Sequence, residues 1–380
     1  MAGTAERATT GTIRSARQHL VRGASVLQPD RMGRPLPDVL RVDWPANTAE
    51  PPAATLAALD RATEVLRTGG RVAIPTETVY GLAADALDEF AVDGIFRAKG
   101  RPATNPLIVH VADVAMAKSL AASWPEAAGR LAAALWPGPL TVVVPRGPDV
   151  PDIVTAGGPT VALRCPAHRL TRLLIARSGI PLAAPSANRS ERVSPTTAHH
   201  VLEGLGDRVD LILDGGPCTQ GIESTVVDCT VTPPRILRPG PLPRRRLEEA
   251  LGGPVLGPDV PAGVVDGPAR SPGAQARHYA PRTRLDMRAD GAARVDELLR
   301  QGRRVGWLTT RVADPAVRAL AASRDLVIVP MPDEPVAFAA ALYAALHALD
   351  RRELDRIVVD EPPSGEEWHA IRDRLTRAAT

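Results

Sequence analysis

Apolar residues recur in short runs from about residue 51 onward, and the runs alternate between two spacings. Over 51–67 they return every three to four positions, which predicts an amphipathic helix that the glycine pair at 69–70 ends. A continuous apolar run at 71–75 then predicts a short buried strand. The same alternation continues to residue 240, so the first part of the chain is predicted to be a layered α/β domain.

The other elements of this domain follow from the same pattern. Helices are predicted at 89–99, 125–136, 169–178 and 196–204. Strands are predicted at 106–111, 139–145, 160–166, 181–188 (running into a loop), 210–216, 224–230 and 235–240.

Two segments lack this periodicity. Residues 1–50 predict a loose extension, and their Arg-rich start lacks the order of a secretory signal, so a disordered extension or a misassigned start codon is favoured over a targeting peptide. Residues 241–280 are dense in glycine and proline, with no credible helix or strand, which predicts a linker or a long functional loop. The expected divisions are therefore an extension (1–50), a first domain (51–245), a linker or lid (246–281) and a second domain (282–380).

The second domain carries three strand patterns, RRVGWLTT, DLVIVPM and DRIVVDEP. Helices are predicted between them at 314–324 and 336–349, and a last one at 365–378. Such regular alternation predicts a small, mostly parallel, Rossmann-like sheet. It contains no GxGxxG, so a dinucleotide site is not expected.

Composition narrows the classes of protein. The net charge of +3 and the pI of about 9.0 are too mild for a dedicated nucleic-acid binder. Three cysteines without metal-like spacing suggest a reducing, cytoplasmic setting. No apolar run approaches the ~18 residues that span a bilayer. Only two of the 46 basic residues are lysines, Lys99 and Lys118, which makes their positions informative.

Polar residues gather where predicted strands end, the usual place of ligands in α/β domains. Four segments do so: PTETVYGL (75–82), RAKGRPATNPLIVH (97–110), APSANRSERVSPT (184–196) and STVVDCTVTPPRILRPG (224–240). Each alone has an ordinary explanation. Residues 75–82 suit a capped loop-to-helix junction, Lys99 a solvated helix end, and His110 a satisfied structural histidine. Together they predict a basic, donor-rich pocket for polyphosphate and carboxylate groups.

These segments, with WPGPLTVVVP (136–145) and TVALRCP (160–166), resemble the YrdC-domain family, the L-threonylcarbamoyl-adenylate synthases. SPGAQARHYAP (271–281) is similar to a signature of the family's long form, in which a linker joins a YrdC-like twisted mixed sheet to a small Rossmann-like parallel α/β domain. This chain has Ala274 and Ala276 where the family often has methionine and an aromatic residue, so we expect a weaker lid contact.

The resemblance implies that L-threonine, bicarbonate (or CO2) and ATP give threonylcarbamoyl-AMP and pyrophosphate. The product would pass to a tRNA threonylcarbamoyl-transferase that modifies adenosine 37 of tRNAs reading codons that begin with A. Mg²⁺ is expected to arrive with ATP, with no protein metal site, and Glu77 either contributes to it or is structural.

The resemblance also carries roles over to matching positions. Lys99 and Arg101 are expected to act on the phosphates. The threonine side is expected to contain Thr78, His110, Arg164, Ala184 and Ser224. The ATP side is expected to contain Arg101, Asn105, Thr160, Ser186, Asn188, Ser194, Arg238, His278 and Tyr279.

Three alternatives stay open at this point. A double-stranded RNA or tRNA-binding module would use the basic pocket, but aromatic residues are only 3% of the chain, which leaves few stacking platforms and at most a weak RNA contact. A carbamoyltransferase-related enzyme would need a further domain, for which 281–380 is too short. A specialised member would act on an amino acid other than threonine.

Overall fold

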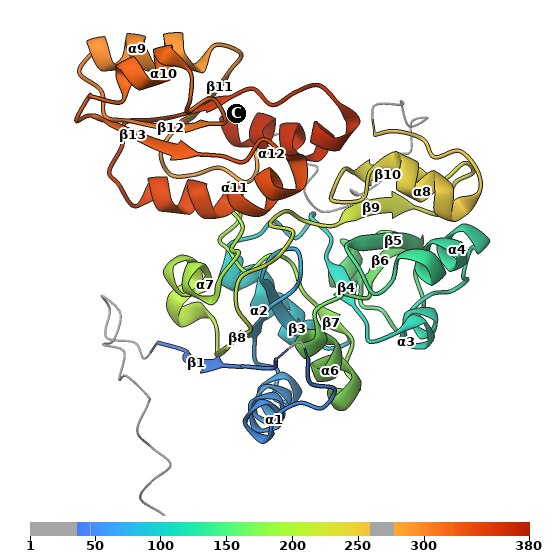
Figure 1. Ribbon diagram of the computed structural model, residues 1–380. Helices are drawn as coiled ribbons and strands as arrows, with labels where there is room; N and C mark the ends of the chain where they lie inside the picture. The colour runs from blue at the N-terminus through green and yellow to red at the C-terminus, as the bar shows by residue number, and fades with distance from the viewer. Residues whose placement is uncertain (1–35, 46, 259–276) are drawn as a thin grey trace, which may run out of the picture. The chain divides into compact units, whose positions relative to one another are not determined.

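The computed structural model describes residues 36–45, 47–258 and 277–380 (Figure 1). All the helices and strands below lie in one of the chain's two compact units, Pro37–Thr380.

A ten-stranded mixed sheet forms the first domain, in the order β1-β8-β2-β3-β7-β4-β6-β5-β9-β10. Four of its neighbouring pairs are parallel (β1/β8, β2/β8, β4/β6 and β5/β9). Its strands are β1 (Asp38–Arg41), β2 (Val72–Ile74), β3 (Gly81–Asp85), β4 (Ile108–His110), β5 (Leu140–Pro145), β6 (Thr160–Arg164), β7 (Leu182–Ala183), β8 (Leu211–Asp214), β9 (Thr225–Asp228) and β10 (Arg235–Arg238).

Apolar side chains cover both faces of this sheet. In β2, Val72 and Ile74 join one buried cluster and Ala73 joins another, so successive side chains enter opposite layers. The helices that supply these layers are α1 (Ala53–Arg67), α2 (Glu89–Lys99), α3 (Val114–Ser119), α4 (Glu126–Leu135), α5 (Asp152–Thr155), α6 (Arg169–Ser178), α7 (Ala198–Leu205) and α8 (Arg244–Leu251). Burial on both faces explains why these strands appear in the sequence as continuous apolar runs.

The second domain is a four-stranded parallel sheet in the order β11-β14-β12-β13. Its strands are β11 (Leu285–Arg288), β12 (Val305–Thr309), β13 (Leu326–Pro330) and β14 (Arg356–Asp360). Its helices are α9 (Gly291–Arg300), α10 (Pro315–Leu320), α11 (Pro335–Asp350) and α12 (His369–Ala379). The predicted α/β fold, with a mixed sheet followed by a Rossmann-like one, is therefore confirmed.

Several local predictions were wrong, each for a physical reason. The loose segment predicted to residue 50 ends earlier, because Asp38–Arg41 pairs with β8. No helix was expected in 241–280, yet Arg244–Leu251 forms α8, which packs on α4. Strand β3 was not predicted, since glycine, alanine and aspartate have weak strand propensity and only pairing with β2 and β7 fixes it. Strand β11 and helices α3, α5 and α9 were also missed.

Residues 259–276 lie outside the described part of the chain, so the expectations for most of the linker, including Ala274 and Ala276, remain predictions.

The two domains share one apolar cluster. Leu342 and Leu346 of α11 pack there with Val79, Val193 and Ile222 of the first domain. The approach is closest at Gly221, where an added Cβ would lie 2.4 Å from the carbonyl oxygen of Ala339 in α11. Gly221 also has φ +73°, a backbone conformation that favours glycine.

Candidate active site

The predicted site residues converge at the ends of neighbouring strands. His110 is the last residue of β4 and Arg164 the last of β6, and their Cα positions pair in the parallel register of these strands. Next to them, Ala184 follows β7 and Ser224 precedes β9. This arrangement is the sheet-edge crevice in which α/β domains hold ligands.

A cavity of about 50 Å³ lies there. Ten of the predicted residues line it: Thr78, Arg101, His110, Arg164, Ala184, Ser186, Ser224, Arg238, His278 and Tyr279. Three arginines and one carboxylate, Glu223, are its charged lining residues, so the cavity favours an anionic ligand. Its volume is far below the ~300 Å³ or more of typical ligand pockets, so the cavity would have to open to admit the predicted nucleotide.

Arg164, predicted to lie on the threonine side, already makes hydrogen bonds within the protein. Its Nη2 donates to Glu77 Oε1 at 2.7 Å, its Nη1 to Thr78 Oγ1 at 2.8 Å and its Nε to the Gly138 carbonyl at 3.3 Å. Burial alone would raise the pKa of Glu77, but the charge and hydrogen bond of Arg164 overcome it and hold this pKa below its usual value. Three of the five N–H donors of Arg164 are therefore used, and two remain for a ligand.

Lys99 lies beneath the cavity lining. Helix α2 begins at the Asp88 N-cap and ends at Gly100, whose φ of +62° turns the chain directly after Lys99. Lys99 is 3% exposed, which excludes a solvated helix end. Its Nζ donates to the carbonyls of Ser186 and Asn188, and burial, followed by Arg101, lowers its pKa well below the usual range. It therefore fixes the 186–188 loop, while the predicted contact with phosphates stays a prediction.

Arg101 lines the cavity and is held by the turn that follows α2. Its Nη2 donates to Asn105 Oδ1 at 2.6 Å and to the Pro106 carbonyl at 2.8 Å, and its Nε donates to the Asn105 carbonyl at 3.1 Å. Burial lowers the pKa of Arg101 to about 10, so the guanidinium keeps its charge at neutral pH. Asn105 thus lies behind Arg101 and orients it.

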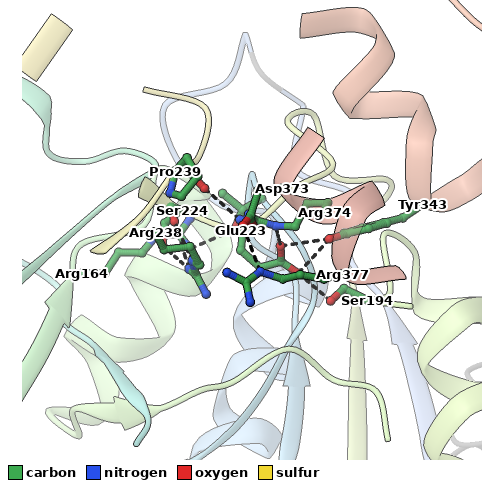
Figure 2. Close-up of polar contacts among 11 residues, drawn as sticks. Arg164, Ser194, Glu223, Ser224, Arg238, Pro239, Tyr343, Asp373, Arg374 and Arg377 are labelled. Atoms are coloured by element: carbon green, nitrogen blue, oxygen red, sulfur yellow. Dashed lines mark hydrogen bonds and ion pairs between the residues drawn. The ribbon is translucent and has the colours of Figure 1, made fainter. Parts of the chain in front are cut away.

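Arg238 and Ser224 form another part of the cavity lining. Nε of Arg238 donates to the Ser224 carbonyl at 3.2 Å, and its Nη2 donates to that carbonyl at 3.0 Å and to Ser224 Oγ at 3.2 Å. Ser224 Oγ also lies 2.7 Å from Thr141 Oγ1. The two predicted residues therefore act as one unit (Figure 2).

Three other predicted ATP residues do not line the cavity. Ser194 is buried and its Oγ donates to Glu223 Oε1 at 2.6 Å. Asn188 uses its Nδ2 to hold the carbonyls of Arg189 and Arg192. Thr160 starts β6, at the opposite end of that strand from Arg164.

His278 and Tyr279, at the end of the linker signature, reach the cavity as predicted from the sequence motif. Tyr279 is 1% exposed and has φ +60°, a conformation that costs a non-glycine residue about 1 kcal/mol or more. Its ring stacks on Tyr343 of α11, with ring centroids 5.9 Å apart.

Several unpartnered buried polar atoms lie in or beside this cavity, and three of them belong to the lining residues His110, His278 and Tyr279. Within the described residues, no hydrogen-bond partner is found for Glu77 Oε2, Asn105 Nδ2, His110 Nδ1, His278 Nδ1 or Tyr279 OH. Such atoms are rare in folded proteins because each costs desolvation free energy. A polar ligand would give partners to those of these atoms that face the cavity, and the structural and ligand-binding interpretations of His110 both stay open.

The two histidines of the cavity are neutral. Burial, followed by the charge of Arg164, lowers the pKa of His110 to about 3. Burial likewise lowers the pKa of His278 to about 3, and the charge of Glu223 only partly opposes this shift. Neither ring carries the second proton that would make it cationic at neutral pH, so each acts there as a neutral hydrogen-bonding group, with one N–H donor and one acceptor nitrogen, and not as a general acid.

A larger cavity, of about 530 Å³, lies elsewhere and contains none of the predicted site residues. Prolines and apolar side chains such as Ile222, Leu242 and Ala339 contribute to its lining. The smaller cavity is the better candidate, because the predicted site residues and the unpartnered atoms of His110, His278 and Tyr279 line it, whereas the larger cavity contains none of them.

A metal centre made of protein groups alone is not present among the described residues, in which no group of three or more His, Cys, Asp or Glu side chains is suitably placed. The lining carboxylate, Glu223, is already bonded to Ser194, Tyr343 and Arg374. No helix in the described part of the chain is long and apolar enough to cross a membrane.

The fold and the cavity thus define a two-domain α/β protein with a cationic site at strand ends. Residues 64–240 match the Sua5–YciO–YrdC family, described as "Telomere recombination", and residues 243–380 match "Threonylcarbamoyl-AMP synthase, C-terminal domain". The chain belongs to the threonylcarbamoyl-AMP synthase family.

Its relatives are similar over most of their length. The threonylcarbamoyl-AMP synthase of Pyrococcus abyssi is 41% identical over 322 residues, covering 83% of this chain and 92% of the relative. That of Bacillus subtilis is 41% identical over 345 residues, covering 88% and 94%. The crystal structure of P. abyssi Sua5 complexed with L-threonine matches with a TM-score of 0.79 and 37% identity, covering 90% of this chain and 97% of that one.

Proposed function

We propose that the protein condenses L-threonine, bicarbonate (or CO2) and ATP into threonylcarbamoyl-AMP and pyrophosphate. The carrying observation is the convergence of three arginines and several unpartnered buried polar atoms on one cavity, in a chain whose relatives bear this activity in their names. The amine of threonine adds to CO2 and releases a proton. An oxygen of the resulting carbamate then bonds to the α-phosphorus of ATP, and the bond to the pyrophosphate leaving group breaks.

On the threonine side, the residues at the ends of β4 and β6 would bind the amino acid. The two uncommitted N–H donors of Arg164 would receive the carboxylate, with Glu77 holding the guanidinium in place. The neutral His110 would contact a polar group of threonine without transferring a proton. The crystal structure of a 37% identical protein complexed with L-threonine supports threonine as the amino acid, while the roles of the individual residues are part of the proposal.

On the ATP side, Arg101 and Arg238 would neutralise charge on the phosphates. A step of this kind depends on alignment and charge stabilisation and needs no protein nucleophile. Lys99, Asn105 and Ser194 would support these groups from behind, as their hydrogen bonds in the structure suggest. Mg²⁺ would be held by phosphate oxygens and water, since it keeps several waters when bound with nucleotides.

The product is a labile mixed anhydride, so we further propose that it passes to a transferase that forms N6-threonylcarbamoyladenosine at position 37 of tRNAs reading codons that begin with A. Any contact of this protein with RNA would be weak, because 3% aromatic residues offer few stacking surfaces. We propose a cytoplasmic site of action, where the tRNA substrate of that transferase is found.

The decisive assay measures pyrophosphate release with ATP, bicarbonate and each of the amino acids in turn. We expect release only with threonine and bicarbonate together. Threonine-dependent ATP–pyrophosphate exchange without bicarbonate would instead indicate an ordinary amino-acid adenylase. A preference for another amino acid would indicate a specialised member of the family.

A further inference from the structure

Glu223, which no sequence motif singled out, connects the candidate site to the second domain. It precedes Ser224, lines the cavity and is 7% exposed. Its Oε1 accepts a hydrogen bond from Ser194 Oγ at 2.6 Å, and its Oε2 accepts from Arg374 Nε at 2.9 Å and Tyr343 OH at 3.1 Å (Figure 2). Burial alone would raise the pKa of Glu223, but these donors and the charges of Arg374 and Arg238 lower it to about 2. The carboxylate is therefore charged and fully engaged.

Arg374, on α12 of the second domain, is the centre of this network. It is fully buried, and each of its three nitrogens has a partner. Nε donates to Glu223, Nη1 donates to Asp373 at 2.6 Å, and Nη2 donates to the Pro239 carbonyl at 3.0 Å. Its guanidinium also lies 4.9 Å from the ring centroid of Tyr279. One side chain thus contacts three separate segments that border the cavity.

The partners of Arg374 are the immediate neighbours of predicted ligand-binding residues. Glu223 adjoins Ser224, and Pro239 adjoins Arg238. These two segments are pressed together, because a Cβ on Gly240 would lie 2.3 Å from the Thr225 nitrogen. Arg374 bonds to both segments, at Glu223 and at the Pro239 carbonyl. Arg238 links the same two segments next to the cavity by donating to the Ser224 carbonyl.

From this geometry we infer that Arg374 is a positioning residue for the nucleotide side of the site, acting through Glu223 on Ser194 and through Pro239 on the neighbouring Arg238. The inference rests on the proposed function, which supplies the nucleotide. The second domain then completes the active site. On the threonine side, Arg164 is held separately by Glu77 and Thr78, so a change at Arg374 affects ATP more than threonine.

The test uses the full chain and the variant Arg374→Lys. Lysine keeps the buried charge but is a point charge without the planar fork, so it cannot hold Glu223 and Pro239 in the same geometry. We expect KM for ATP to rise about tenfold, a change on the order of 1.4 kcal/mol, with a clearly smaller rise in KM for threonine. Arg372→Lys is the matched control, because Arg372 lies on the same helix and is bonded to Glu361 and Pro362 within its own domain.

Tyr343→Phe provides a second, milder variant if Arg374→Lys folds poorly. It removes one hydrogen bond to Glu223 and leaves the ion pair, so KM for ATP should rise about two- to fivefold with little change in Tm. Threonine and ATP KM values that change equally, or activity losses that only follow a lower Tm, would mean a merely structural role and overturn the inference. Wild-type protein that makes no threonylcarbamoyl-AMP would overturn the proposed function itself, and the positioning role with it.

Discussion

At the scale of single residues, the candidate site is made of charged side chains that are buried and held by the backbone. Lys99 and Arg101 were both expected to contact phosphates. In the structure Arg101 lines the cavity, whereas Lys99 supports the loop that carries Ser186. Two nearby residues of one motif thus have different roles. Arg101 lines the cavity, and Lys99 holds the loop that carries the lining residue Ser186.

This difference predicts different consequences of substitution. Arg101→Ala should reduce adenylate formation by on the order of 10²-fold, because a charge contact to the phosphates is lost. Lys99→Ala should in addition lower the free energy of unfolding, since the buried Asn188 carbonyl loses its lysine donor, at roughly 1–3 kcal/mol, and the Ser186 carbonyl keeps only the backbone N–H of Asn188. Turnover and urea unfolding measure the two effects. Lys118→Ala is the control, as Lys118 is the other lysine of the chain and is exposed. Equal stability of the Lys99 and Lys118 variants would contradict the supporting role.

At the scale of elements, α7 of the first domain and α11 of the second meet through two histidines. The rings of His200 and His347 stack with centroids 3.9 Å apart. Burial, followed by the partner His347, lowers the pKa of His200 to about 3, and burial also lowers the pKa of His347. The charged and titratable groups around them are His199, Glu203, Asp350 and Arg351. Both rings are therefore neutral in the folded protein at neutral pH.

The sign of the resulting pH dependence follows from linkage. The folded-state pKa of His200 lies below its unfolded value. Its contribution to the stability of the folded protein is therefore complete above about pH 6.5 and declines as the pH falls from there toward 3. Tm should therefore drop between pH 7.5 and pH 5, and His200→Gln should make that drop shallower while lowering Tm at pH 7.5 through loss of the stack. His199→Gln, an exposed neighbour on the same helix, should keep the wild-type profile. If Tm falls with pH equally in His200→Gln and in the wild type, protonation of the histidine pair does not contribute to the loss of stability in acid.

At the scale of the whole molecule, the sequence predicted the fold and the strand-end residues because both depend on local pattern. Apolar periodicity located most helices and strands, and polar residues after strands located His110 and Arg164. The sequence did not predict Arg374 as a partner of Glu223. The two residues are 151 positions apart, and neither belongs to a motif that would single it out. The Gly/Pro-rich texture after residue 240 likewise hid α8, whose formation depends on packing against α4.

The close contact at Gly221 tests whether association of the two domains matters for the site. Gly221→Ala places a methyl group against the backbone of Ala339 and Ala340 and forces an alanine into a left-handed conformation, which alone costs about 1 kcal/mol. A backbone contact cannot rotate away as a side chain would, so α11 must shift. We expect a Tm lower by about 3 °C or more.

The same shift should loosen Tyr343, and through it Glu223, so KM for ATP should rise in Gly221→Ala as it does in Arg374→Lys. Gly204→Ala is the matched control, because Gly204 lies within α7 and an added Cβ there meets nothing within 4 Å. Alanine at that helical position should be neutral or stabilising by up to about 1 kcal/mol. If Gly221→Ala and Gly204→Ala share one Tm and one KM for ATP, close packing of the domains is not what organises the nucleotide side. If only Gly221→Ala has both a lower Tm and a higher KM for ATP, the second domain acts on the site through that contact.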